Sequence, residues 1–179
     1  MMKKAVLVID VQNGLFETGE KPFEADEVIK RINKITSRAR ELNLPVIFIQ
    51  HTQKKGLLTE GSHEWEIHKD LIVNKTDIKI NKTTPDSFLK TELQNYLLSN
   101  NIEELIICGY ASEFCVDTTT RKAAALGYSV YLVGDAHTTH DKNHASGKQI
   151  REHHNATLPD LTSFDAKISL VNSSDLSFM

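Results

Sequence analysis

Apolar positions along the chain follow two alternating patterns. Continuous runs rich in Val, Ile and Leu, typical of strands buried on both faces, occupy residues 5–10, 46–50, 105–109, 128–136 and 166–171. Apolar residues spaced every three or four positions, typical of amphipathic helices, occupy residues 24–43, 88–97, 114–127 and 143–156. The stretch 51–77 has no strong period, and residues 71–83 are expected to hold one or two short strand pieces.

The alternation of strands and helices predicts an α/β fold with one doubly wound, mostly parallel sheet and helices on both faces. There is no internal repeat, low-complexity segment or linker, so we expect residues 1–179 to form a single domain. In such sheets, ligands bind at the carboxyl ends of strands, where the strand order reverses. The candidate site residues at strand ends are therefore Asp10, His51, Lys82, the 110–115 loop and residues 135–137.

Charge and composition narrow the function classes. The net charge of −3 gives no electrostatic reason to expect nucleic acid or an anionic membrane as a partner. The first strand–helix turn, DVQNGLFETGEKP, contains neither glycine-rich phosphate motif, so no nucleotide cofactor is expected. The apolar run before Asp10 is too short for an export signal, and we therefore expect a cytoplasmic protein with two reduced cysteines.

The two cysteines lie in the stretch CGYASEFCVD, residues 108–117. Cys108 closes an apolar run and is expected to be a small buried hydrophobe. Cys115 follows a loop and begins a predicted helix, whose free N–H groups and dipole would favour the thiolate. Local sequence alone does not decide whether Cys115 is a nucleophile or an inert thiol. It also leaves Asp10 open between a general base and a structural acid, and Lys82 between a site residue and solvated surface.

Three stretches taken together resemble the isochorismatase-like cysteine hydrolase superfamily. They are DVQNGLF at 10–16, NKTTPDSF at 81–88 and GYASEFCVDTTTRKAAALGY at 109–128, and the resemblance extends over nearly the whole chain. It implies the doubly wound fold and a catalytic triad of Asp10, Lys82 and Cys115. It also implies a cis peptide bond between Tyr110 and Ala111, with the Ala111 and Cys115 amides forming an oxyanion hole.

The family chemistry implied by these residues is hydrolysis through a cysteine thioester, without a cofactor. Because isochorismatases that cleave a vinyl ether generally do not need the cysteine, we expect a small-molecule substrate with an amide, lactam-like or ureido C–N bond. The vinyl-ether activity, a binding module on the same fold and a redox-sensing Cys115 remain alternatives. The residues expected to contact the substrate are Phe16, His51, Trp65, His68, Tyr110 and Phe114.

Nicotinamidases resemble this chain but carry a metal-binding D-x-H sequence after the second strand. Here that segment reads QHTQ, with His51 in place of the aspartate and Gln53 in place of the histidine, so no metal is expected. The histidines at 137, 140 and 144 could share a helical face, but a surface or subunit-contact role is the stronger expectation. The family commonly assembles as homodimers or homotetramers, and we expect the same here.

Overall fold

The computed structural model describes residues 3–178 of the 179-residue chain. Its six-stranded sheet has the order β3-β2-β1-β4-β5-β6, and every neighbouring pair is parallel. The strands are β1 (Lys3–Ile9), β2 (Val46–His51), β3 (Ile78–Lys82), β4 (Ile102–Tyr110), β5 (Ser129–Thr138) and β6 (Ile168–Val171). The helices are α1 (Asn13–Phe16), α2 (Ala25–Glu41), α3 (Leu93–Ser99), α4 (Asp117–Ala125) and α5 (Gly147–Thr157), with a π-helical turn η1 (Ser112–Val116).

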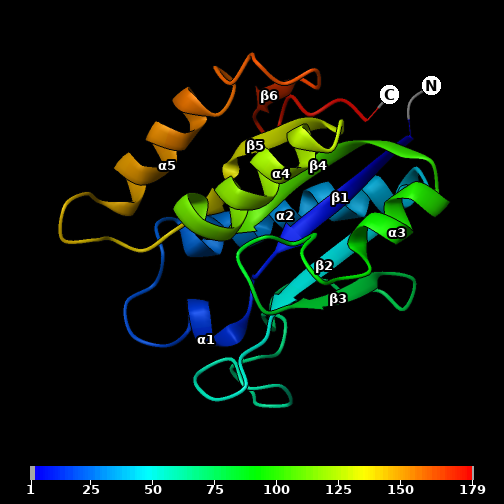
Figure 1. Cartoon of the computed structure of the whole chain (residues 1–179). Coiled ribbons are helices and arrows are strands. Elements are labelled where there is room, and N and C mark those ends of the chain that lie inside the picture. The colour runs from blue at the N-terminus through cyan, green and yellow to red at the C-terminus, as the bar shows by residue number, and fades with distance from the viewer. Residues whose placement is uncertain (1–2, 179) are drawn as a thin grey trace.

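Helices cover the sheet on both faces (Figure 1). On one face, strand residues such as Leu7 pack with Leu93 of α3 and Ala123 of α4. On the other face, strand residues such as Val8 pack against Val28 of α2. Successive side chains of a strand point to opposite faces, so the continuous apolar run of β1 supplies both cores. The predicted doubly wound α/β architecture is confirmed.

The strand order reverses beside β1. From there the chain builds outward through β2 and β3, then returns to the other side of β1 and continues through β4, β5 and β6. The carboxyl ends of β1 and β4 therefore border the crevice at the reversal point. Asp10 and the 110–115 loop, which the sequence analysis placed at strand ends, lie at these two ends.

Several element boundaries differ from the sequence expectation. The helix expected over 88–97 begins only at Leu93, because residues 83–92 form turns held by side chains such as Asp86, whose Oδ1 accepts from the Phe88 N–H. The helix expected from residue 114 begins as η1, and α1 has no apolar period to announce it. Within residues 3–178, no helix is both long and apolar enough to cross a membrane.

Candidate active site

Three side chains from separate strand ends meet at the carboxyl edge of the sheet. Asp10 directly follows β1, Lys82 ends β3, and Cys115 lies in η1 after β4. The Lys82 Nζ atom is 2.7 Å from Oδ2 of Asp10 and 3.2 Å from Sγ of Cys115. The structure therefore brings these three predicted site residues together.

The lysine and the aspartate form a buried ion pair. Their side chains are 0% and 2% exposed, respectively. The pair uses only one carboxylate oxygen, and Oδ1 of Asp10 has no hydrogen-bond partner among the described residues. A buried oxygen without a partner is costly, so its persistence next to a cysteine indicates an acceptor kept free for a proton or a ligand.

The thiol of Cys115 is protonated in this arrangement, contrary to the expectation that its position favours the thiolate. Burial, together with the Asp10 carboxylate, raises the pKa of Cys115 to about 12, although the Lys82 ammonium opposes the increase. The expectation considered only the start of a helix. It omitted the burial of the sulfur, which is the larger cause, and the Asp10 carboxylate, which repels a thiolate.

His51 is a fourth member of the cluster. Its Nδ1 lies 3.2 Å from Nζ of Lys82, so the three N–H groups of the ammonium face Asp10, His51 and Cys115. Burial, and next the Lys82 charge, lower the pKa of His51, so the ring is neutral at neutral pH. Gln12 holds the His51 backbone on both sides: its Oε1 accepts from the His51 N–H at 2.8 Å, and its Nε2 donates to the His51 carbonyl at 3.0 Å.

The ligand atoms of Asp10, His51 and Cys115 all lie within 4.8 Å of one another, and they form the only metal-type cluster among the described residues. Carboxylate, imidazole and thiolate are zinc ligands. Here the same three groups contact the Lys82 ammonium, and that positive charge opposes a metal ion among them.

The three histidines weighed as a cluster have separate environments. His137 is fully buried: its Nε2 donates to Asn155 and its Nδ1 accepts from Ser112 of η1, both at 2.8 Å. Burial lowers the pKa of His137 to about 4. The surface role expected for this histidine is therefore wrong, because strand β5 continues to Thr138 and carries it inside. His140 contacts the Tyr110 hydroxyl at 2.8 Å, and His144 is exposed.

The loop before the cysteine contains the expected cis peptide bond between Tyr110 and Ala111. The Ala111 carbonyl accepts from the backbone N–H groups of Phe114 and Val116, both at 3.1 Å, which folds η1 over the end of β4. The buried contact of Ser112 with His137 fastens the same turn to β5. Sequence analysis missed the positioning contacts of Gln12, Ser112 and His137. Their only sequence signal was a polar residue at the end of an apolar strand.

Two of the expected substrate contacts, Phe16 and His68, are buried in the protein instead, whereas Trp65 is half-buried. Phe16 is 1% exposed, and its ring packs edge-on against those of His68 and Tyr110. His68 is also buried. The Trp65 indole donates to the Thr52 hydroxyl at 2.9 Å, which anchors the loop after β2. Tyr110 is half-buried and is the last residue of β4, which borders the crevice.

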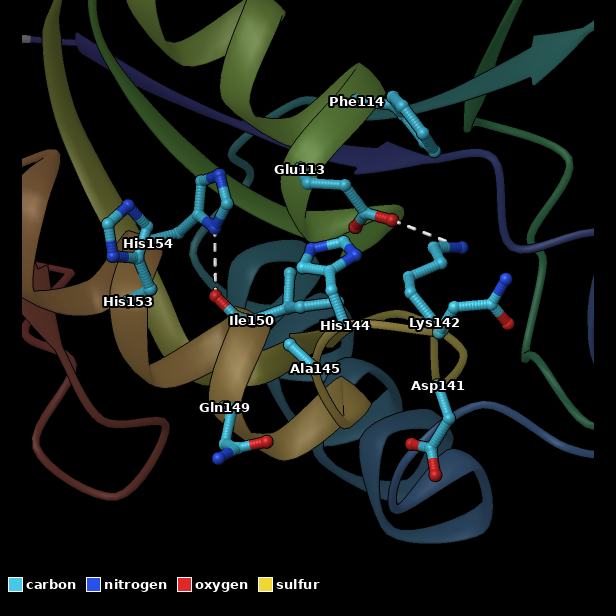
Figure 2. A pocket seen from close by; sticks show the side chains of 11 residues that line it. Glu113, Phe114, Asp141, Lys142, His144, Ala145, Gln149, Ile150, His153 and His154 are labelled. Atoms are coloured by element: carbon cyan, nitrogen blue, oxygen red, sulfur yellow. Dashed lines mark hydrogen bonds and ion pairs between the residues drawn. The ribbon is translucent and has the colours of Figure 1, made fainter.

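Phe114 lies in a separate cavity of about 820 Å³ between η1 and the start of α5 (Figure 2). The Lys142 ammonium lies over the face of its ring, 5.5 Å from the ring centroid, and also pairs with Glu113 at 3.2 Å. Neither Asp10 nor Cys115 lines this cavity, so its size does not make it the reaction site. A smaller cavity of about 630 Å³ opens at the ends of β2 and β3 and is lined by His51 of the cluster.

Known proteins resemble this chain in sequence and in fold. A family model described as the isochorismatase domain matches residues 4–160. Over 146 residues the chain is 34% identical to a streptothricin hydrolase of Streptomyces noursei, covering 80% of this chain and 58% of that protein. Over 172 residues it is 30% identical to nicotinamidase 3 of Arabidopsis thaliana, covering 88% and 79%. A solved isochorismatase family protein matches with a TM-score of 0.86 and 31% identity, over 94% of this chain and 98% of that one.

The chain therefore belongs to the isochorismatase family. It spans 58% and 50% of the lengths of two streptothricin hydrolases that it matches.

Proposed function

We propose that this protein is a cysteine hydrolase that cleaves an amide-type C–N bond of a small molecule through a thioester on Cys115. The observation that carries the proposal is the contact of one buried ammonium, Lys82 Nζ, with both the Asp10 carboxylate and the Cys115 sulfur. A nucleophile, a proton acceptor and a fixed positive charge are the groups that acyl transfer requires. Two relatives named as a streptothricin hydrolase and a nicotinamidase support the same reaction class.

The reaction begins with proton transfer from Cys115 to Oδ1 of Asp10, the carboxylate oxygen without a partner. The thiolate attacks the carbonyl carbon, and a C–S bond forms while the carbonyl electron pair moves to oxygen. The backbone N–H groups of Ala111 and Cys115 hold that oxyanion. The C–N bond then breaks, and the departing nitrogen takes the proton from Asp10.

Water completes the cycle. Asp10, now a carboxylate again, accepts a proton from the water molecule that attacks the thioester carbon. The C–S bond breaks, the sulfur recovers a proton, and the products are a carboxylic acid and an amine or ammonia. Lys82 stabilises each species in which sulfur carries negative charge, and without this lysine the pKa of Cys115 would be higher still.

The experiment is a screen of small amides, ureido compounds and isochorismate, with ammonia and pyruvate measured separately. Ammonia release supports the proposal. Pyruvate release without ammonia would contradict it and indicate that the protein hydrolyses a vinyl ether instead. Rapid quenching followed by intact-mass measurement should detect the acyl group on wild-type protein. The Cys115→Ala variant should show neither turnover nor the adduct, with an unchanged circular dichroism spectrum. Full turnover in that variant would eliminate the covalent route.

A further inference from the structure

The cavity beside His51 is positively charged. Its lining consists of His51, Thr52, Gln53, Lys54, Lys55 and Thr83, which includes two ammonium groups and no carboxylate. The chain as a whole carries a net charge of −3, so this local excess of positive charge opposes the overall balance. Clefts that gather one sign of charge concentrate ligands of the opposite sign.

The loop that carries the two lysines has a defined shape. The Gln53 N–H donates to the Leu58 carbonyl at 2.8 Å, and the Gln53 side-chain oxygen accepts from the Leu58 N–H at 3.2 Å. Gly56 turns the chain with a φ of +130°, and a Cβ there would lie only 2.6 Å from that same oxygen. The ends of the loop are therefore tied together, and Lys54 and Lys55 project from a closed turn next to the cavity.

Neither lysine is neutralised by the protein. In the part of the chain that the structure describes, no carboxylate lies within ion-pair distance of Lys54 or Lys55, whereas Lys21, Lys30 and Lys69 each pair with an acid. Two adjacent ammonium groups repel each other, and a bound anion would relieve that repulsion. The two unpaired charges border a cavity that is also lined by His51, whose ring contacts Lys82 of the reactive cluster.

His51 adds a donor with a fixed direction. Because the Lys82 ammonium can only donate, Nδ1 of His51 must accept, and the ring proton of the neutral imidazole therefore resides on Nε2. Among the described residues, no hydrogen-bond partner faces Nε2. His51 thus adds one neutral N–H donor to a cavity lining that also contains the two ammonium groups of the loop.

From this arrangement we infer that the cavity binds a carboxylate, so that the substrate class is amides that also carry a carboxylate group. The inference rests on the proposed hydrolase function and deepens it. Lys54 and Lys55 hold the carboxylate, and His51 Nε2–H donates to a polar atom between the carboxylate and the scissile carbonyl. The substrate is thereby oriented with its carbonyl carbon toward Cys115, and neutral amides lack this attachment.

The direct test compares succinamate with succinamide, which have the same length and differ in one terminal charge. Binding of each to the Cys115→Ala protein is measured by titration calorimetry at low and high salt. Succinamate should bind at least about tenfold more tightly, and its advantage should shrink as salt rises. In the Lys54→Ala/Lys55→Ala double variant, the succinamate-to-succinamide affinity ratio should fall toward one. In the matched control Lys75→Ala, which changes an exposed lysine outside the cavity, the ratio should stay at the parent value.

Equal affinities for the two compounds, absent succinamate binding, or an unchanged ratio in the double variant would each overturn the carboxylate site. Turnover separates this result from the proposed function. Ammonia release from both compounds at equal efficiency would contradict the carboxylate site but support the proposed hydrolase activity. Charge-selective binding without ammonia release by the wild-type protein would keep the site and count against the hydrolase.

Discussion

Replacing Asp10 with asparagine should increase the reactivity of Cys115 toward a small neutral disulfide while it abolishes turnover. In the wild-type protein, burial and the Asp10 carboxylate raise the pKa of Cys115 from an ordinary 9.0 to about 12. Asparagine has almost the same shape but no charge. The Lys82 ammonium, 3.2 Å from the sulfur, would then have only the thiolate to neutralise it, which lowers the pKa of Cys115.

The size of the effect follows from the three-unit difference in pKa. Below pH 9 the wild-type sulfur is thiolate about a thousandfold less often than an ordinary thiol. A thiolate of higher pKa is intrinsically more nucleophilic, with a Brønsted coefficient of about 0.4–0.5, which recovers roughly 15- to 30-fold. The wild-type rate should therefore be roughly 30- to 60-fold below that of an ordinary thiol. Asp10→Asn should recover part of this deficit, because it removes the carboxylate but leaves the burial of the sulfur, the larger cause of the raised pKa.

The assay follows thiopyridone release from 4,4′-dithiodipyridine between about pH 6 and 9. Cys108 is 0% exposed, and burial raises its pKa even further, so it contributes little signal in the folded protein. The Cys115→Ser variant measures that background. If Asp10→Asn reacts no faster than wild type, or if the wild-type rate titrates at the ordinary pKa of 9.0, then the charge arrangement described for these three residues is wrong.

Three further predictions concern the residues that support the site. Burial lowers the pKa of His137 from 6.5 to about 4 in the folded protein, so as the pH falls the unfolded chain protonates this histidine before the folded one does. The free energy of unfolding should therefore decrease by up to about 3 kcal/mol between about pH 6.5 and pH 4. A His137→Gln variant should lack that slope in thermal melts, and an identical slope would contradict the assignment. Gly109→Ala should lower the free energy of unfolding, measured in urea, by about 3 kcal/mol or more. Residue 109 has a φ of +122°, and the added Cβ would lie 2.1 Å from the carbonyl oxygen of Ile9 in β1. Gly127→Ala, at a φ of +92° with no neighbouring atom, should cost only about 1 kcal/mol, and equal losses would refute the steric argument. Gln12→Leu should lower the free energy of unfolding by about 2–4 kcal/mol and reduce kcat/KM, because it leaves the His51 backbone N–H and carbonyl without their hydrogen-bond partner. Unchanged values would show that Gln12 does not hold His51.

The apolar pattern predicted the sheet and the helices well, because burial on both faces leaves no polar position inside a central strand. The run before Asp10 became β1, and residues 24–43 contain α2. The pattern failed where side chains, not periodicity, organise the backbone. Residues 83–92 carry apolar Phe88 and Leu89 at helix-like positions, yet they form turns. In these turns Asp86 Oδ1 accepts a hydrogen bond from the Phe88 N–H, and the Thr91 hydroxyl donates one to a backbone carbonyl.

Sequence motifs also identified the residues that gather at the sheet edge, but they did not determine what those residues do to one another. The rule that the carboxyl ends of parallel strands share an edge pointed to Asp10, Lys82 and the 110–115 loop, and the resemblance to the cysteine hydrolase superfamily then singled out Asp10, Lys82 and Cys115. The protonation state of Cys115 could not be predicted from the sequence. It depends on the burial of the sulfur and on its distances from one carboxylate and one ammonium. The packed positions of Phe16 and His68 were likewise invisible, because aromatic residues suit a pocket and a core equally well.

By itself, then, the sequence determined the fold class, the parallel strand ends and the identity of three chemically apt side chains, since periodicity and motif are local properties of the chain. Only the tertiary structure decided that His51 completes the contacts of Lys82, that Asp10 keeps one oxygen free, and that a loop with two unpaired lysines borders the site. These facts depend on distances between segments far apart in sequence, and such distances are set by packing, which no local pattern records.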